Sequence, residues 1–190
     1  MVDKFLKYGG SEVRNKLLKV SIMIFQKGKE PSDFRKTIVK PLHKKGDKSE
    51  CGNYRSISLV SLGSKLLSNM LIFRLRDAVD KVLREEQCCF RKGRGFIDQI
   101  FILRLIIEKC LNYETPLILG FKDYERAFNS VNKRALSKVL SFYDVPEKQM
   151  KVISAIYVNN TAVVKVGNEV SSWFCTKSGV KQGCVLSPFV

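Results

Sequence analysis

A short apolar run followed by an acidic residue is the feature that most constrains the fold of this chain. Residues 116–120, with the sequence PLILG, are too few for a helix of their own and predict a buried β-strand. Beyond Asp123 the apolar residues adopt helical spacing, at Leu136, Val139, Leu140 and Tyr143. Asp123 is therefore expected at the end of a buried strand, where the chain turns towards a helix.

The carboxylate of Asp123 has two interpretations at such a position. It can point out of the sheet edge and hold a divalent cation such as Mg²⁺, which prefers oxygen ligands and usually combines one or two carboxylates with substrate phosphates. A lone acidic residue after a strand is more commonly a helix cap or a solvated charge. Its position in the sequence leaves both interpretations open.

The charge of the chain favours a polyanionic partner. Lysine and arginine number 34 against 18 acidic residues, which gives a net charge of +16. Residues 1–110 carry 24 of these basic residues and 12 of the acidic ones, so most of the excess lies there. Nucleic acid is the simplest partner for a protein with such an excess of positive charge. A basic protein kept soluble by its charge, or one attracted to an anionic membrane surface, remains an alternative.

Composition and cysteine usage indicate a globular intracellular protein. The 190 residues are 45% hydrophobic and 27% charged, enough for one domain or two small lobes. Residues 1–10 lack the apolar core of a signal peptide, and Arg104 and Glu108 interrupt the apolar stretch 99–110, so no membrane span is expected. The cysteines form no C-x-x-C pair, which argues against zinc and favours reduced thiols in the nucleus or cytoplasm.

Periodicity predicts most of the remaining elements. Helices are expected around residues 18–25, 62–79 and 100–111, and after Pro146. Residues 34–41 alternate like a strand, and strands at 161–166 and 170–174 flank a Gly167-Asn168 hairpin turn. The polar stretch 43–53 predicts a mobile finger or hairpin tip.

Several segments resemble motifs of reverse transcriptases from non-LTR (LINE-like) retrotransposons. Residues 121–131, FKDYERAFNSV, resemble the first catalytic motif of that family, F-x-D-x-x-x-A-F-D-x-V, and depart from it at Asn129. Residues 54–59, YRSISL, resemble NYRPISL, and the preceding IVKPLHKKGDK resembles I-P-K-K-G-D-x. Residues 86–94 resemble E-x-Q-x-G-F-R-x-G-R, and 178–188, SGVKQGCVLSP, resemble G-V-R-Q-G-C-P-L-S-P. The motifs occur in the family's order across nearly the whole chain.

The resemblance implies an α+β fold, a right-hand polymerase with fingers and a partial palm. Residues 1–112 would form the fingers-like region with an N-terminal helix. Residues 113–190 would form the partial palm with the first catalytic motif and the nucleotide loop. The family's [YF]-x-D-D hairpin does not occur in these 190 residues, so the palm is expected to be truncated before it. A degraded element copy, a partial gene model and a shortened product would each account for this.

The implied activity is RNA-templated DNA synthesis by two-metal nucleotidyl transfer, and this chain alone is expected to be inactive. The expected partners are an RNA template, a DNA primer and deoxynucleotide triphosphates, with Mg²⁺ or Mn²⁺ as cofactor in the complete enzyme. The alternative is a non-catalytic, basic nucleic-acid-binding remnant, which leaves the question of enzymatic activity open.

The resemblance also implies roles for individual residues. Asp123 would be the catalytic metal ligand, and the backbone carbonyl of Tyr124 a second oxygen ligand. The residues expected to bind the nucleotide are Lys44, Arg55, Tyr124, Phe128, Gln182 and Gly183. Arg55, and with it Lys44, would hold the triphosphate, because a guanidinium fork suits phosphate oxygens. Phe128 would pack under the sugar or, alternatively, belong to the core. Arg91, Lys92 and Arg94 would contact the template backbone without reading its sequence.

Overall fold

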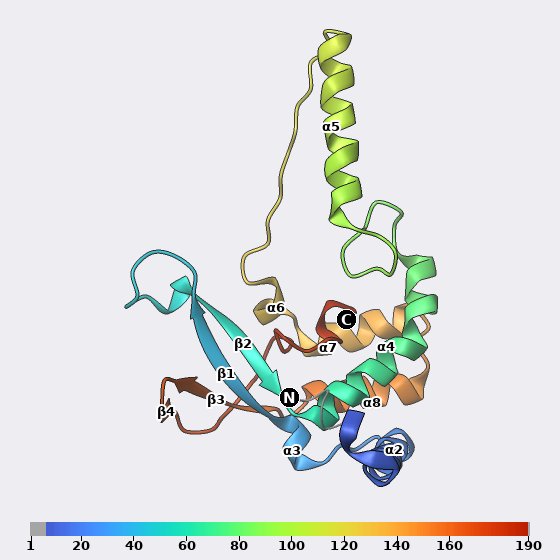
Figure 1. Ribbon diagram of the computed structural model, residues 1–190, viewed down its shortest axis with the longest axis vertical. Coiled ribbons are helices and arrows are strands. Elements are labelled where there is room, and N and C mark those ends of the chain that lie inside the picture. Colours follow the sequence, from blue (N-terminus) through green and yellow to red (C-terminus); the bar gives the residue numbers. More distant parts are fainter. Residues whose placement is uncertain (1–6, 190) are drawn as a thin grey trace. The chain divides into compact units, whose positions relative to one another are not determined.

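A computed structural model describes residues 7–189 of the chain, and its elements are labelled in Figure 1. The first six residues of the stretch 1–10, where no signal peptide was expected, lie outside the described part. The chain forms two compact units: residues 1–75 together with 126–190, and residues 76–125. The structure is mixed α+β, as the sequence predicts. The division of the sequence into fingers and palm at residue 112 is a functional one and stays a prediction.

The first unit is built on a small mixed sheet. Strand β1 (Lys36–His43) lies between β2 (Tyr54–Val60), to which it is antiparallel, and β3 (Thr161–Val166), to which it is parallel. Two short strands, β4 (Glu169–Val170) and β5 (Phe174–Cys175), pair antiparallel with β3. The central strand thus joins two parts of the chain that are far apart in sequence.

The turn between β1 and β2 is a hairpin tip held by its own hydrogen bonds. The amide of Lys44 donates to the carbonyl of Asn53 at 2.8 Å, and the side chain of Asn53 donates to the carbonyl of Asp47 at 2.9 Å. The Tyr54 hydroxyl donates to the carbonyl of Lys48 at 2.9 Å. The prediction of a hairpin tip is confirmed, and these bonds give the loop a defined shape.

Besides the sheet, the first unit contains several helices. They are α2 (Gly10–Lys27), α3 (Ser32–Arg35), the start of α4 (Leu62–Val82), α6 (Ala127–Ser130), α7 (Lys133–Phe142), α8 (Glu147–Tyr157) and two short 3₁₀ turns, Cys51–Asn53 and Ser187–Phe189. Helix α2 ends at Gly28, whose φ of 63° is a left-handed conformation that glycine adopts readily. The side chain of Asn132 caps α7 by accepting from the amides of Arg134 and Ala135.

The core of the first unit joins α4, α8, β3 and the C-terminal turn. Its most buried apolar side chains are Leu67, Leu71, Val152, Ile153, Ile156, Val163 and Leu186. Val180 and Cys184 are also buried. Residues 182 and 183, in the expected nucleotide loop, therefore lie between two anchors in the core.

The second unit contains the end of α4, a loop and helix α5 (Phe96–Asn112), followed by an extended segment. Helix α5 has no buried residue. None of the described helices is both long and apolar enough to cross a membrane.

The prediction of a strand at residues 116–120 is wrong. This segment forms no strand, and Ile118 and Phe121 are 95% and 84% exposed. A strand needs a neighbour to pair its backbone groups, and none of the strands β1 to β5 pairs with these residues. Smaller differences occur elsewhere. Strand β1 begins two residues later than predicted because residues 32–35 form α3, and the predicted strand 170–174 is divided between β4 and β5.

Candidate nucleotide-binding and template-binding sites

The expected nucleotide loop is attached to the segment that carries Phe128. The amide of Val180 donates to the carbonyl of Phe128 at 2.8 Å, and the amide of Gly179 donates to the carbonyl of Val131 at 2.9 Å. A Cβ atom on Gly179 would come within 2.9 Å of the carbonyl oxygen of Asn129. Two motifs that lie some fifty residues apart in sequence are therefore in direct backbone contact.

The same loop also contacts strand β2. The amide of Ser58 donates to the carbonyl of Gln182 at 2.6 Å. Gly183 has a φ of 113°, and a Cβ atom on it would lie 2.8 Å from the carbonyl oxygen of Ser58. Only glycine fits here, both for its backbone conformation and for this close approach.

The residues around Gln182 form a tight turn. The carbonyl of Lys181 accepts from the amide of Cys184 at 2.9 Å and from the hydroxyl of Ser187 at 2.8 Å. Ser187 also lies 3.1 Å from the Tyr157 hydroxyl, whose pKa is raised by burial. The Cys184 thiol lies 3.3 Å from the hydroxyl of Ser68 in α4. These contacts fix the loop from inside the core.

The two basic residues expected at the triphosphate lie on the β1–β2 hairpin. Lys44 and Arg55 are both exposed, and Arg55 pairs with Leu42 in the strand register. Arg55 is three residues from Ser58, which corresponds to about 10 Å along the strand. The first unit thus brings together Phe128, Gln182 and Gly183 with the strand that carries Arg55.

Asp123 and Tyr124 lie near the end of the second unit, so their placement relative to the nucleotide loop is not described. Both are exposed, and the segment before them is not a strand. No group of three His, Cys, Asp or Glu side chains able to hold a metal ion occurs between residues 7 and 189. Asp123 supplies a carboxylate of the kind Mg²⁺ prefers, but one carboxylate does not make a two-metal centre.

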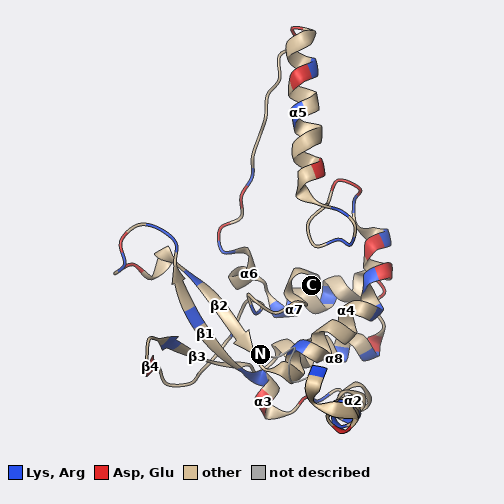
Figure 2. Ribbon diagram, viewed as in Figure 1, with Lys and Arg blue, Asp and Glu red and all other residues tan. Residues whose placement is uncertain are grey.

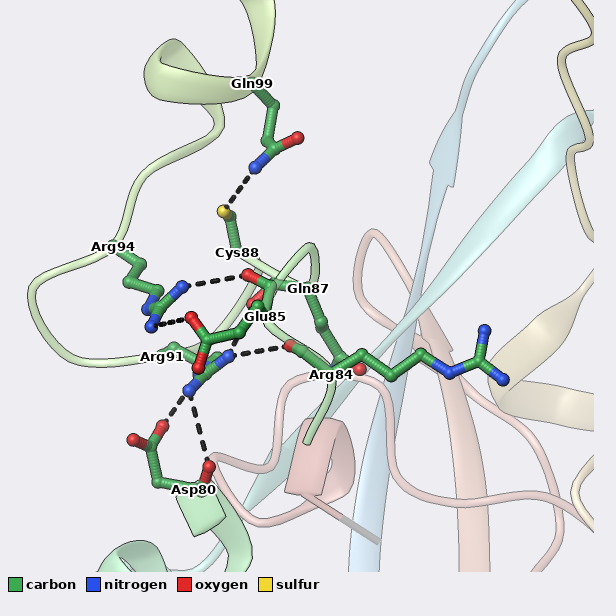
Figure 3. A network of polar contacts seen from close by, with 8 residues as sticks. All are labelled: Asp80, Arg84, Glu85, Gln87, Cys88, Arg91, Arg94 and Gln99. Carbon is green, nitrogen blue, oxygen red and sulfur yellow. Dashed lines mark hydrogen bonds and ion pairs between the residues drawn. The ribbon is translucent and has the colours of Figure 1, made fainter. Parts of the chain in front are cut away.

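Arg91, expected at the template, instead contacts its own loop (Figure 3). Its guanidinium donates to the carboxylate of Asp80 at 2.7 Å and to the carbonyl of Arg84 at 2.8 Å. The side chain is only 3% exposed. The hydrogen bond from Arg91 lowers the pKa of Asp80. The structure therefore directs Arg91 into the protein.

The other two residues of this basic cluster are exposed. Arg94 donates to the carbonyl of Glu85 at 2.8 Å and to its carboxylate at 2.6 Å. Lys92 is exposed on the same loop. Figure 2 shows basic residues both on this loop and on the β1–β2 hairpin, with acidic residues among them.

A buried charged cluster, not predicted from the sequence, lies beneath the nucleotide loop. The Glu30 carboxylate is fully buried, 3.7 Å from Nε of Arg35, and the buried Lys181 donates from Nζ to the carbonyl of Phe34 at 3.3 Å. Neither Glu30 oxygen accepts a hydrogen bond from any residue that the structure describes. Burial raises the pKa of Glu30 to about 7 against the opposing attraction of Lys181 and Arg35, and burial lowers that of Lys181. Between Gly28 and Pro31, Glu30 resembles an ordinary solvated charge in the sequence.

The buried carboxyl of Glu30 predicts that stability falls as pH rises. Its pKa is 4.5 without burial and about 7 in the folded chain, so the folded state binds the proton more tightly. The contribution of Glu30 to the free energy of unfolding therefore falls by about 3 kcal/mol at most between pH 4.5 and 7. Above pH 7 this contribution stays constant. Urea unfolding of the wild type and Glu30→Gln at pH 5 to 8 measures this, and the variant should lack the slope. Glu12→Gln, at an exposed ion pair with Lys16, is the matched control. An equal slope in Glu30→Gln would contradict the assignment.

Comparison with known families decides the classification. The profile described as "Reverse transcriptase (RNA-dependent DNA polymerase)" matches residues 42–190. The chain belongs to the reverse transcriptase family. Its matched region includes strand β2, the Asp123 motif and the nucleotide loop, the parts in which the motif resemblance was found.

Named relatives place this reverse transcriptase among those of non-LTR retrotransposons. The chain is 27% identical to the "Transposon TX1 uncharacterized 149 kDa protein" of Xenopus laevis, over 86% of this chain and 12% of that protein. It is 28% identical to the "Probable RNA-directed DNA polymerase from transposon BS" of Drosophila melanogaster, over 84% of this chain and 18% of that protein. It is also 27% identical to the R2 retrotransposable element polyprotein of Popillia japonica, over 77% of this chain and 20% of that protein. The chain therefore spans a fifth or less of the length of these relatives.

Proposed function

We propose that this chain is the fingers, residues 1–112, and the first part of the palm, residues 113–190, of a retrotransposon enzyme that copies RNA into DNA. The observation that carries the proposal is the backbone contact between three family motifs in the first unit. The nucleotide loop bonds both to the Phe128 segment and to β2. A surface assembled from these motifs is suited to a nucleotide placed against Gln182 and Gly183.

Each residue expected to bind the nucleotide has a proposed role, which the resemblance to the family supplies. Gln182 and Gly183 lie against the base and sugar, where glycine permits close backbone approach. Phe128 is partly buried beside them and packs under the sugar. Arg55 and Lys44 hold the triphosphate from the exposed side of the hairpin.

The proposed metal ligands are the Asp123 carboxylate and the carbonyl of Tyr124. A pair of divalent cations, Mg²⁺ or Mn²⁺, would activate the primer hydroxyl and hold the triphosphate when bound. Asp123 contributes one of the negative ligands that such a centre needs. The remaining carboxylates are not among the described residues, so no catalytic step is assigned to this chain alone.

A second candidate function is supported by the charge of the chain. A net charge of +16 and the lack of a grouped set of metal ligands among residues 7–189 also fit a basic remnant that binds nucleic acid without chemistry. The two functions share RNA template and DNA primer as partners. They differ in whether a deoxynucleotide takes part.

The proposed function predicts salt-sensitive binding to an RNA–DNA primer–template. With three or four phosphate contacts, affinity should fall roughly 40- to 150-fold between 50 and 200 mM salt, because each contact releases counterions. Fluorescence anisotropy of a labelled duplex, titrated at several salt concentrations, measures this. Lys92→Met should reduce the salt slope, which is the slope of log affinity against log salt concentration, by about 1. Lys138→Met, at an exposed position in α7, is the control and should leave the slope unchanged.

Adding the deoxynucleotide complementary to the template separates the two candidates. If Gln182, Gly183 and Arg55 bind nucleotide beside the primer end, the complementary deoxynucleotide should strengthen retention of the duplex and a mismatched one should not. The binding-only alternative predicts no difference between them. A flat salt response, or no binding at low salt, would exclude both functions.

A further inference from the structure

The loop between α4 and α5, residues 83–95, has an unfavourable backbone conformation for its sequence. Phe90 has a φ of 61°, in the left-handed region, although it is not glycine, and its side chain is 61% exposed. Such a conformation costs roughly 1–2 kcal/mol and persists where the surroundings over-determine it. Since Phe90 gains little from burial, another interaction must hold the loop.

That interaction is the neighbouring side chain, Arg91 (Figure 3). Besides the Asp80 carboxylate and the Arg84 carbonyl, its guanidinium donates to the carbonyl of Gln87 at 3.2 Å and to that of Asp80 at 3.3 Å. Asp80 lies in the last turn of α4, whose carbonyls have no partner within the helix, and a cation there also complements the helix dipole. Arg91 thus ties two carbonyls of the loop, those of Arg84 and Gln87, to the end of α4.

Few donors of Arg91 remain for a nucleic acid. A guanidinium has five N–H donors, and four contacts within the protein use most of them. A side chain that is 3% exposed also cannot approach a phosphate without leaving its site. The next residue, Lys92, is exposed and carries a charge of the same sign.

We propose that Arg91 is a positioning residue, which folds residues 84–94 onto the end of α4 and so presents Lys92 to the phosphate backbone of a nucleic acid that Arg91 itself does not touch. The role of Lys92 rests on the proposed function, whereas the clamp formed by Arg91 and Asp80 stands on the described contacts alone. Asp80 is the second member of this clamp.

The clamp makes a prediction opposite to that of simple electrostatics. Asp80→Asn removes a negative charge beside the binding surface, so charge alone predicts tighter nucleic-acid binding. The clamp predicts weaker binding, because an uncharged amide holds the guanidinium less strongly and the loop loses its shape. Arg91→Lys keeps the charge but cannot reproduce the fork of donors, so it should weaken binding as well.

Hydrogen exchange of the chain without nucleic acid tests the clamp first. Peptides covering residues 84–94 should exchange about tenfold faster in Arg91→Lys and Asp80→Asn, while peptides of α7 and α8 are unchanged. Glu85→Gln is the matched control, since it removes a nearby exposed carboxylate that pairs with Arg94 rather than Arg91. Unchanged exchange in both clamp variants would overturn the proposal. If Arg91→Lys unfolds the whole chain, the exchange rates of Asp80→Asn alone decide whether the clamp holds the loop.

A double-mutant cycle then tests whether Arg91 acts through Lys92. In the wild type, Lys92→Met should lower the salt slope of duplex binding by about 1. In the Arg91→Lys background it should lower the slope by less than half as much, because Lys92 is no longer held in place. Equal effects in both backgrounds would show that Arg91 does not position Lys92. If the wild type binds no duplex, the proposed function fails, while the exchange experiment still tests the clamp.

Discussion

We expect Asp123→Asn to abolish primer extension in a polypeptide that continues this chain through the Asp-Asp hairpin of a relative. Asparagine keeps the shape of the side chain and one oxygen ligand but removes the negative charge that offsets the repulsion between two divalent cations. We expect a loss of about a thousandfold or more in rate, which corresponds to about 4 kcal/mol of transition-state stabilisation. Extension of a DNA primer on an RNA template, followed on a gel with Mg²⁺ or Mn²⁺, is the measurement.

Asn129→Asp is the matched control for that experiment. It restores the acidic residue usual in the family's motif, six positions beyond Asp123, where no metal contact is expected. The rate should change by no more than about twofold, the size expected for an exposed surface substitution. Activity that survives Asp123→Asn but changes greatly in Asn129→Asp would mean that the wrong position was assigned to the metals. An extended polypeptide with no activity at all would count against the proposed function itself.

Gly183→Ala should destabilise the first unit by about 3 kcal/mol. Alanine is strained at a φ of 113°, and its Cβ would have to displace the backbone carbonyl of Ser58, which lies 2.8 Å away. That displacement also weakens the hydrogen bond from Ser58 to Gln182. Urea unfolding at fixed pH measures the loss, and hydrogen exchange of the Ser58 amide should become faster.

Gly167→Ala separates the two causes of that loss. Gly167 has a φ of 58°, but a Cβ atom there would meet no atom of the described residues within 4 Å. Gly167→Ala should therefore lower the free energy of unfolding only by the cost of the backbone conformation, about 1 kcal/mol. Equal losses in the two variants would mean that the contact with Ser58 contributes nothing to the effect of Gly183→Ala.

Local patterns predicted most of the elements in the first unit. The alternation of residues 34–41 and the turn residues Gly167 and Asn168 identified β1 and the β3–β4 hairpin, because such signals depend on a few neighbouring residues. The helices α2, α4, α7 and α8, and helix α5 of the second unit, were predicted from apolar spacing for the same reason. The family motifs added the expectation of an α+β fold, and the mixed α+β structure agrees with it.

The failures concern properties that depend on distant partners. Residues 116–120 have the composition of a strand, but composition does not supply the neighbour that a strand requires. The contacts of Arg91 within the protein were not predicted either, because the sequence gives its charge and not the Asp80 carboxylate that faces it. Glu30 looks solvated because its burial against Lys181 joins residues 151 positions apart. The roles of the individual site residues remain predictions.

The parallel pairing of β1 with β3 has a consequence for synthesis of the protein. Lys36 pairs with Thr161, so about 125 residues separate the two strands. At a synthesis rate of roughly 5–20 residues per second, the ribosome needs about 6 to 25 s to deliver the second strand after the first. The β1–β2 hairpin can form early, but one edge of β1 stays open during that interval and offers a template for pairing with other nascent chains. The order of translation therefore exposes this hairpin to aggregation before folding is complete.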